Sequence, residues 1–99
     1  MQLIVISQDG KAFVDLDITF CVKINNRHVS AFDIMAVSGS ASQWLGTYDT
    51  EGEAMTIMSM LLAKLFAPNC SLFMLPKRDD KKAIDNYRVI LDDVGENND

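Results

Sequence analysis

Residues 44–66 constrain the fold most strongly, because they combine a strand, a tight corner and a capped helix. Residues 43–48 are expected to form a strand whose side chains point alternately to its two faces. Thr50–Glu53 has the S/T-x-x-E form of a capping box. In that motif the threonine and glutamate side chains reciprocally satisfy two backbone N–H groups at the start of a helix. Apolar side chains then recur at helical spacing, at Ala54, Ile57, Met58, Leu61, Leu62 and Leu65. The stretch predicts a strand that leads directly into an amphipathic helix, whose apolar stripe packs on a sheet.

Four further strands are expected before this stretch. Asp9-Gly10 separates two apolar runs, which favours a hairpin with a type I′ turn. The expected strands are residues 3–6, 12–16, 18–24 and 31–36, with Asn25–His28 as a polar turn and 38–42 as a small-residue loop. Together with residues 43–48 they predict an antiparallel β-meander of about five strands, packed on one helix in an α+β fold.

The rest of the chain predicts a short late strand and a C-terminal helix. Cys70–Leu75 is an apolar run closed by Pro76, which is typical of an edge strand. Residues 77–82 form a mixed-charge connector, and Asp79 or Asp80 is placed to cap a following helix. That helix presents Ile84, Tyr87, Leu91 and Val94 at helical spacing. We therefore expect a core domain over 1–76, then a connector, helix and acidic tail over 77–99.

The charge balance restricts the classes of partner. Nine Lys and Arg residues against fourteen Asp and Glu residues give a formal net charge of −5. Nucleic acids and anionic membranes bind clustered positive charge, so neither is an expected partner. No apolar run approaches the roughly 20 residues that span a bilayer, and Cys21 and Cys70 do not form a disulfide framework. We expect a cytoplasmic protein with reduced cysteines.

No arrangement of residues predicts catalysis, a metal site or a cofactor. The loop at 38–42 lacks the G-x-S-x-G pattern of a nucleophile elbow, and His28 is the single histidine. Cys21, His28 and Cys70 have no metal-ligand spacing. The carboxylates of Asp15, Asp17 and Asp33 are expected to be solvated on strand surfaces. The expected protein is not an enzyme.

Two groups of side chains are candidate binding residues. The helix over 51–66 has no charged residue between Glu53 and Lys64, and Met55, Met60 and Phe66 lie on the flanks of its apolar stripe. Together the stripe and its flanks form an apolar surface that is wider than packing against one sheet face requires. The C-terminal segment, a second subunit or another protein is therefore expected to cover the flanks.

Trp44 and Tyr48 form the second group. In a regular strand both would lie on the same face, with Gly46 between them. Two aromatic side chains beside a glycine can form a shallow slot for a ligand. The competing interpretation, which is favoured, is that both aromatic side chains pack on the sheet while Gly46 lets a neighbouring segment approach closely.

Three short motifs carry a resemblance. Ile6-Ser-Gln-Asp-Gly10, then Leu45-Gly-Thr-Tyr48 followed by Glu51–Ala54, and finally Phe73-Met-Leu-Pro76 occur in this order. The pattern resembles that of small uncharacterised proteins from Gram-positive bacteria and their phages, and it covers most of residues 1–76. Leu75 departs from the last motif. The resemblance implies the fold and a phage or prophage context, and no catalytic or binding residue.

The leading functional hypothesis is a homo-oligomeric protein–protein interaction module. One alternative is a binding protein for a metabolite or nucleotide that uses Trp44, Tyr48 and the 38–42 loop. Another alternative is a phage inhibitor that binds a host defence protein through an acidic face.

Overall fold

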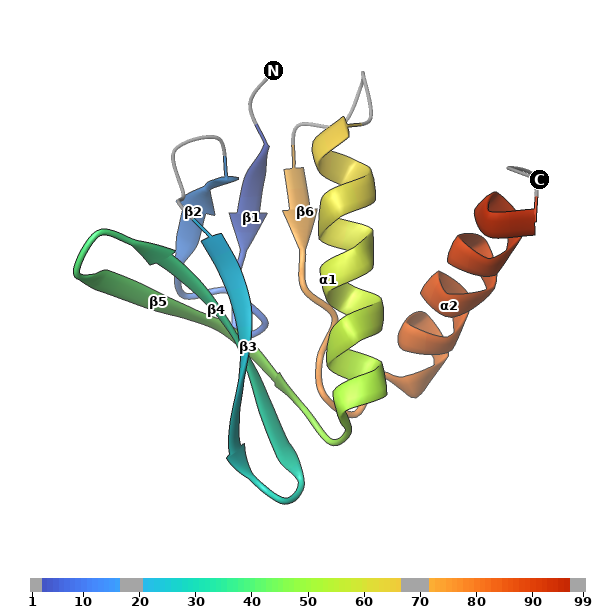
Figure 1. Cartoon of the computed structure of the whole chain (residues 1–99), viewed down its shortest axis with the longest axis horizontal. Coiled ribbons are helices and arrows are strands. Elements are labelled where there is room, and N and C mark those ends of the chain that lie inside the picture. Colours follow the sequence, from blue (N-terminus) through green and yellow to red (C-terminus); the bar gives the residue numbers. More distant parts are fainter. Residues whose placement is uncertain (1–2, 17–20, 67–71, 97–99) are drawn as a thin grey trace.

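A computed structural model describes residues 3–16, 21–66 and 72–96, with residues 93–96 described by backbone alone. The elements are β1 (Ile4–Ile6), β2 (Phe13–Asp15), β3 (Cys21–His28), β4 (Ala31–Ser38), β5 (Ala41–Tyr48), α1 (Glu51–Phe66), β6 (Leu72–Met74) and α2 (Lys81–Glu96) (Figure 1). The predicted α+β class, the helix after β5, the late strand and the C-terminal helix are confirmed. The predictions for Asp17, Ile18, Phe20, Cys70 and the acidic tail after Glu96 lie outside the described residues.

The strands form two three-stranded sheets, so the prediction of one five-stranded meander is wrong. The first sheet has the order β2-β1-β6, with β1 antiparallel to β2 and parallel to β6. The second sheet is the antiparallel meander β3-β4-β5. Alternation of apolar residues identifies a strand but does not identify its partner, and the β1–β6 pair joins residues that are 68 positions apart.

The β1–β2 hairpin forms as predicted, but its turn is longer than the two-residue type I′ turn. The Ser7 N–H donates to the Ala12 carbonyl, and the Gly10 N–H donates to the Ser7 carbonyl. Gly10 has a φ of 73°, whereas no non-glycine residue among those described has a positive φ, so Asp9 is not left-handed. The Asp9 carboxylate instead accepts from the Ser7 hydroxyl and the Lys11 N–H and holds the loop.

Both turns of the β3-β4-β5 meander are shorter than expected. Asn25 pairs with Asp33, and His28 pairs with Ala31, so residues 25–28 belong to β3 and the turn is Val29–Ser30. Ser38 pairs with Ala41, so the expected loop over 38–42 is a tight turn at Gly39–Ser40. Backbone pairing with β4 extends both neighbouring strands into polar sequence that local composition assigns to loops.

Gln8 joins the two sheets through its backbone and its side chain. The backbone N–H of Gln8 donates to the Leu45 carbonyl at 2.6 Å. Its side-chain amide donates to the Thr47 carbonyl at 3.0 Å and accepts from the Thr47 N–H at 3.1 Å. The same amide nitrogen also donates to the Pro76 carbonyl at 3.1 Å. Gln8 therefore satisfies the edge of β5 in the way that a neighbouring strand would.

Gly46 makes room for this junction, as predicted from its place between Trp44 and Tyr48. A Cβ atom at Gly46 would lie 3.0 Å from Leu75 Cδ2 and 3.2 Å from Gln8 Cβ. Glycine therefore fits this close contact between β5 and the segment after β6 without displacing either neighbour. Tyr48 is fully buried beside it and donates its hydroxyl to the Pro76 carbonyl at 2.7 Å.

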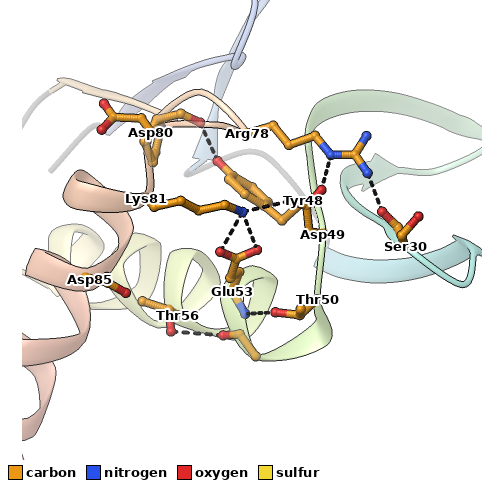
Figure 2. Close-up of polar contacts among 12 residues, drawn as sticks. Ser30, Tyr48, Asp49, Thr50, Glu53, Thr56, Arg78, Asp80, Lys81 and Asp85 are labelled. Carbon is orange, nitrogen blue, oxygen red and sulfur yellow. Dashed lines mark hydrogen bonds and ion pairs between the residues drawn. The ribbon is translucent and has the colours of Figure 1, made fainter.

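Helix α1 begins at the predicted cap, but only half of the capping box forms. The Glu53 N–H donates to Thr50 Oγ1 at 3.1 Å. The Glu53 carboxylate does not return to the cap; it accepts from Lys81 Nζ at 2.8 and 3.0 Å (Figure 2). The glutamate expected to stabilise the start of α1 therefore ties α1 to the start of α2.

Helix α2 packs beside α1 (Figure 1). Apolar and charged side chains both hold it in place. Ile84 is buried in the same core cluster as Met60 and Phe73, and the Tyr87 ring lies 5.8 Å from the Phe73 ring. Asp80 caps the helix, since its carboxylate accepts from the Ala83 N–H at 3.2 Å. Helix α2 therefore contributes Ile84 to the same core as the rest of the chain.

The charged contacts gather around Asp49. Its carboxylate accepts from Arg78 Nε and from Lys81 Nζ, and Arg78 also donates to the Ser30 carbonyl (Figure 2). Lys81 and Arg78 together hold the pKa of Asp49 below its usual range, and the Asp49 and Glu53 carboxylates raise the pKa of Lys81. These pairs are partly solvated, so they orient α2 more than they stabilise it.

We predict opposite effects for the same substitution at two glycines. Gly46→Ala should destabilise the protein by about 1–3 kcal/mol, because the added methyl group overpacks the contact with Leu75 and Gln8. Gly52→Ala should stabilise it by up to about 1 kcal/mol, because Gly52 lies in α1 and the nearest side-chain atom, Thr50 Oγ1, would be 3.9 Å from the added methyl group. Urea unfolding measures both, and equal effects would contradict the assigned packing.

Candidate functional site

The three candidate residues on α1 do not form one surface. Met60 is 3% exposed and belongs to the core cluster that also contains Ile84 of α2. It is therefore a core residue and does not lie on an accessible surface. Met55 and Phe66 are exposed. The sequence predicted that something besides the sheet covers this helix, and α2, which packs beside α1, is one such cover.

An apolar groove runs along the remaining flank of α1. It has a volume of about 400 Å³, and we call it the helix groove. Its lining residues come from α1 and from the chain before and within β3: Leu16, Cys21, Val22, Met55, Met58, Ser59, Leu61, Leu62 and Leu65. Met55 thus belongs to this surface, while Phe66 does not line it. None of these nine described side chains is charged.

Trp44 and Tyr48 lie on opposite faces of the meander, so the expected aromatic slot does not form. Gly46 pairs with Ile34 and Trp44 pairs with Met35, which leaves Leu45 as the extra residue of a β-bulge. Because of this extra residue, Trp44 and Tyr48 point to opposite faces of β5, although simple alternation would place them on the same face. Tyr48 consequently enters the core, where burial raises the pKa of its phenol, and Trp44 lies on the other face.

Trp44 belongs to a polar chain on that other face. Its indole N–H donates to Thr47 Oγ1 at 2.9 Å, and the Thr47 hydroxyl donates to the Asp33 carboxylate at 2.5 Å. Arg27 donates to both Asp33 oxygens, at 2.8 and 3.2 Å. Asp33 is buried, so the prediction that it is solvated is wrong. The Arg27 guanidinium is the main cause that holds the pKa of the Asp33 carboxyl below its usual value.

The outer side of the β2-β1-β6 sheet is a further apolar surface, which was not among the candidates from the sequence. Residues that pair across the strands share this side, which we call the outer face: Ile4, Ile6, Phe13, Asp15, Leu72 and Met74. Phe13, Leu72 and Met74 are 73%, 59% and 47% exposed. Val5, Val14 and Phe73 point the opposite way, into the core.

The sequence carried one signal for this surface. Leu3–Ile6 has no polar alternation, a pattern typical of a strand that is buried on both faces or lies at the centre of a sheet. Val5 is fully buried, whereas Ile4 and Ile6 are only partly buried and lie on the outer face. An apolar run in a strand thus marked an exposed apolar side.

The described residues contain no group of three or more His, Cys, Asp or Glu side chains that could hold a metal ion. Within that part of the chain, neither helix has the length and apolar character needed to cross a membrane. Comparison of the chain with protein-family models, curated proteins and solved structures finds no significant match.

The buried Asp33 predicts a specific dependence of stability on acid. Its native pKa lies below the usual value of 3.8, so the ionised carboxylate stabilises the fold above that pH. This contribution is lost as the pH falls through the lowered native pKa. Asp33→Asn should reduce the unfolding free energy at pH 7 by about 1–3 kcal/mol and should weaken the further loss between about pH 4 and pH 2.

Circular dichroism during urea unfolding at several pH values measures this difference. Asp85→Asn is the matched control, because Asp85 is exposed and pairs only with the neighbouring Arg88 among the contacts described. If Asp33→Asn and the wild-type protein lose stability in parallel on acidification, the assigned coupling of Asp33 to Arg27 is wrong.

Proposed function

We propose that this protein is a homo-oligomeric interaction module, whose role is binding and not catalysis. The observation that carries the proposal is the outer face, on which five of six side chains are apolar and three of them are substantially exposed. Contiguous apolar surface of this kind is characteristic of sites that bind another protein. Self-association would cover it without any additional component.

The expected association is weak. Burying a whole apolar side chain contributes about 1.5–3 kcal/mol. For the exposed parts of Phe13, Leu72 and Met74, counted in two copies, this amounts to about 5–10 kcal/mol before costs. Association itself costs about 4–15 kcal/mol, so the net affinity corresponds to a transient dimer and not to a permanent one.

The acidic-face alternative has less support. Several carboxylates of this acidic chain are engaged within the fold: Asp33 pairs with Arg27, and Asp49 and Glu53 pair with Lys81. Such a face would need carboxylates that are oriented toward a basic partner. The proposed interaction therefore rests on apolar contact.

Sedimentation over a range of protein concentrations tests self-association. We expect a reversible monomer–dimer equilibrium that Phe13→Ser shifts at least tenfold toward monomer, because it removes the most exposed side chain of the outer face. Val29→Ser is the control, since Val29 is an equally apolar and exposed residue in the turn between β3 and β4. A wild-type protein that stays monomeric at millimolar concentration would refute the proposal.

A second candidate function is the binding of a small apolar molecule in the helix groove. Its volume of about 400 Å³ lies within the range of ligand pockets, and its lining is almost entirely apolar. This candidate replaces the expected ligand slot at Trp44 and Tyr48, whose side chains the bulge in β5 separates.

Titration with the neutral apolar dye Nile red tests this second function. Ser59→Phe should abolish dye binding, because Ser59 lines the helix groove and a phenyl ring would fill it. Ala63→Phe introduces the same ring at an exposed position of α1 that does not line the groove, and should keep the dye affinity. Equal affinities in the two variants would rule out the helix groove as the binding site.

A further inference from the structure

We infer that the free edge of β3 and the helix groove together form a docking site for an extended peptide of another protein. The peptide joins β3 as an added strand, with apolar side chains in the groove and acidic side chains alternating with them on the opposite face. The site lies on the β3-β4-β5 sheet, so it is separate from the outer face and does not depend on the proposed self-association. It uses the groove of the second candidate function, and peptide and dye binding distinguish the two occupants.

The edge of β3 is the longest open strand edge in the described part of the chain. The edge strands of the first sheet, β2 and β6, have three residues each. Gln8 occupies the edge of β5 at Leu45 and Thr47. Strand β3 has eight residues, of which six are exposed, and the backbone hydrogen bonds described for it reach only β4. Its outer edge therefore offers N–H and C=O groups to which an extended chain can add.

The side chains of β3 determine which face of an added strand is apolar. Val22 and Ile24 pack against the core, on the side that α1 covers. Lys23 and Asn25 alternate with them and are exposed. An added strand lies about 4.7–4.9 Å from its neighbour, and its side chains alternate between the same two faces. Every second side chain of the peptide therefore points to the side of Val22.

The helix groove lies where those side chains enter. Val22 lines it together with Met55 and Leu62 of α1, which are 51% and 58% exposed. The apolar flank of α1 is thus left open next to the last strand of the sheet. One more strand beside β3 would cover this flank and fill the groove of about 400 Å³ with its apolar side chains.

The charges of β3 determine what the other face of the peptide carries. The strand contains Lys23 and Arg27 and no acidic residue, in a chain whose formal net charge is −5. Arg27 pairs with Asp33, whereas none of the ion pairs among the described residues includes Lys23. Opposite charges across paired strands stabilise the pairing, and like charges destabilise it. An acidic side chain therefore fits opposite Lys23, and the β3 of a second copy supplies none.

Fluorescence anisotropy with the labelled, acetylated heptapeptide Glu-Leu-Glu-Val-Glu-Leu-Glu tests this site. The regular pairing of β3 ends at Asn26, before its register shift, so seven residues are long enough to span it. We expect binding, and at least tenfold weaker binding of Glu-Glu-Leu-Val-Leu-Glu-Glu, which has the same composition without the alternation. The basic peptide Lys-Leu-Lys-Val-Lys-Leu-Lys should also bind at least tenfold more weakly, although the net charge of −5 attracts it.

Two methylated forms of the acidic peptide separate strand addition from simple filling of the groove. In an antiparallel strand the N–H groups of alternate residues point to the same neighbour. Methylation of the amide nitrogens of only the glutamates, or of only the apolar residues, should therefore have unequal effects, with at least tenfold weaker binding for one form. Equal affinities of the two forms would overturn strand addition. This comparison leaves the protein itself unchanged.

Variants of the protein test the two parts of the site. Lys23→Glu should weaken binding of the acidic peptide about tenfold, because it replaces an attractive cross-strand pair by a repulsive one. Lys82→Glu makes the same change of charge at an exposed position of α2 and should leave the affinity within about twofold. Equal effects of these two variants would overturn the acidic partner. Ser59→Phe should abolish binding, whereas Ala63→Phe should not, and circular dichroism confirms that each variant is folded.

Each failure has its own signature. A protein that stays monomeric but binds the acidic peptide refutes the proposed self-association and supports this site, and Phe13→Ser should leave peptide affinity unchanged. A protein that binds Nile red but not the acidic peptide at millimolar concentration keeps the second candidate function and overturns the peptide site. A dimer that Phe13→Ser leaves intact and that the acidic peptide dissociates would place a second copy on the edge of β3 and overturn the assignment to another protein.

Discussion

The side-chain amide of Gln8 is the contact on which the relation between the two sheets depends. It reproduces, with one side chain, the donor and acceptor that a neighbouring strand would offer to Thr47 on the edge of β5. Its third hydrogen bond reaches Pro76, which also accepts from Tyr48. Three distant parts of the chain thus meet at one buried polar group, and a satisfied group of this kind specifies a unique arrangement where apolar packing alone would tolerate several.

Local signals in the sequence were sufficient for the elements and insufficient for their arrangement. Thr50 marked the start of α1, Asp80 was one of two expected caps for α2, and Gly46 was recognised as a packing residue. The two caps depend on neighbours within a few positions, whereas the residues that Gly46 packs against, Leu75 and Gln8, are distant in the sequence. The parallel pair of β1 and β6 and the contact of Glu53 with Lys81 depend on segments far apart in sequence, which a single sequence does not specify.

The candidate surfaces show the same division. Met55 and Met60 both lay on the flanks of the apolar stripe of α1, but Met60 is buried in the core and Met55 is exposed. Trp44 and Tyr48 looked like neighbours, and one inserted residue in β5 separates them. The outer face could not be recognised from the sequence, because an apolar strand is normally covered on both sides. Only the arrangement of β2, β1 and β6 shows that one side is exposed.

The pairing of β1 with β6 has a consequence for the order in which the chain can fold. Closing a loop of this length has an entropic cost that local hairpins and helices do not bear. During synthesis the β3-β4-β5 meander and α1 can form from adjacent residues as they emerge. The first strand can complete its sheet only after Leu72–Met74 has left the ribosome. Until then its hairpin has one strand neighbour, and the Gln8 amide lacks its acceptor at Pro76. Strand β1 therefore completes its sheet later than the β3-β4-β5 meander and α1 can form, although it precedes them in the sequence.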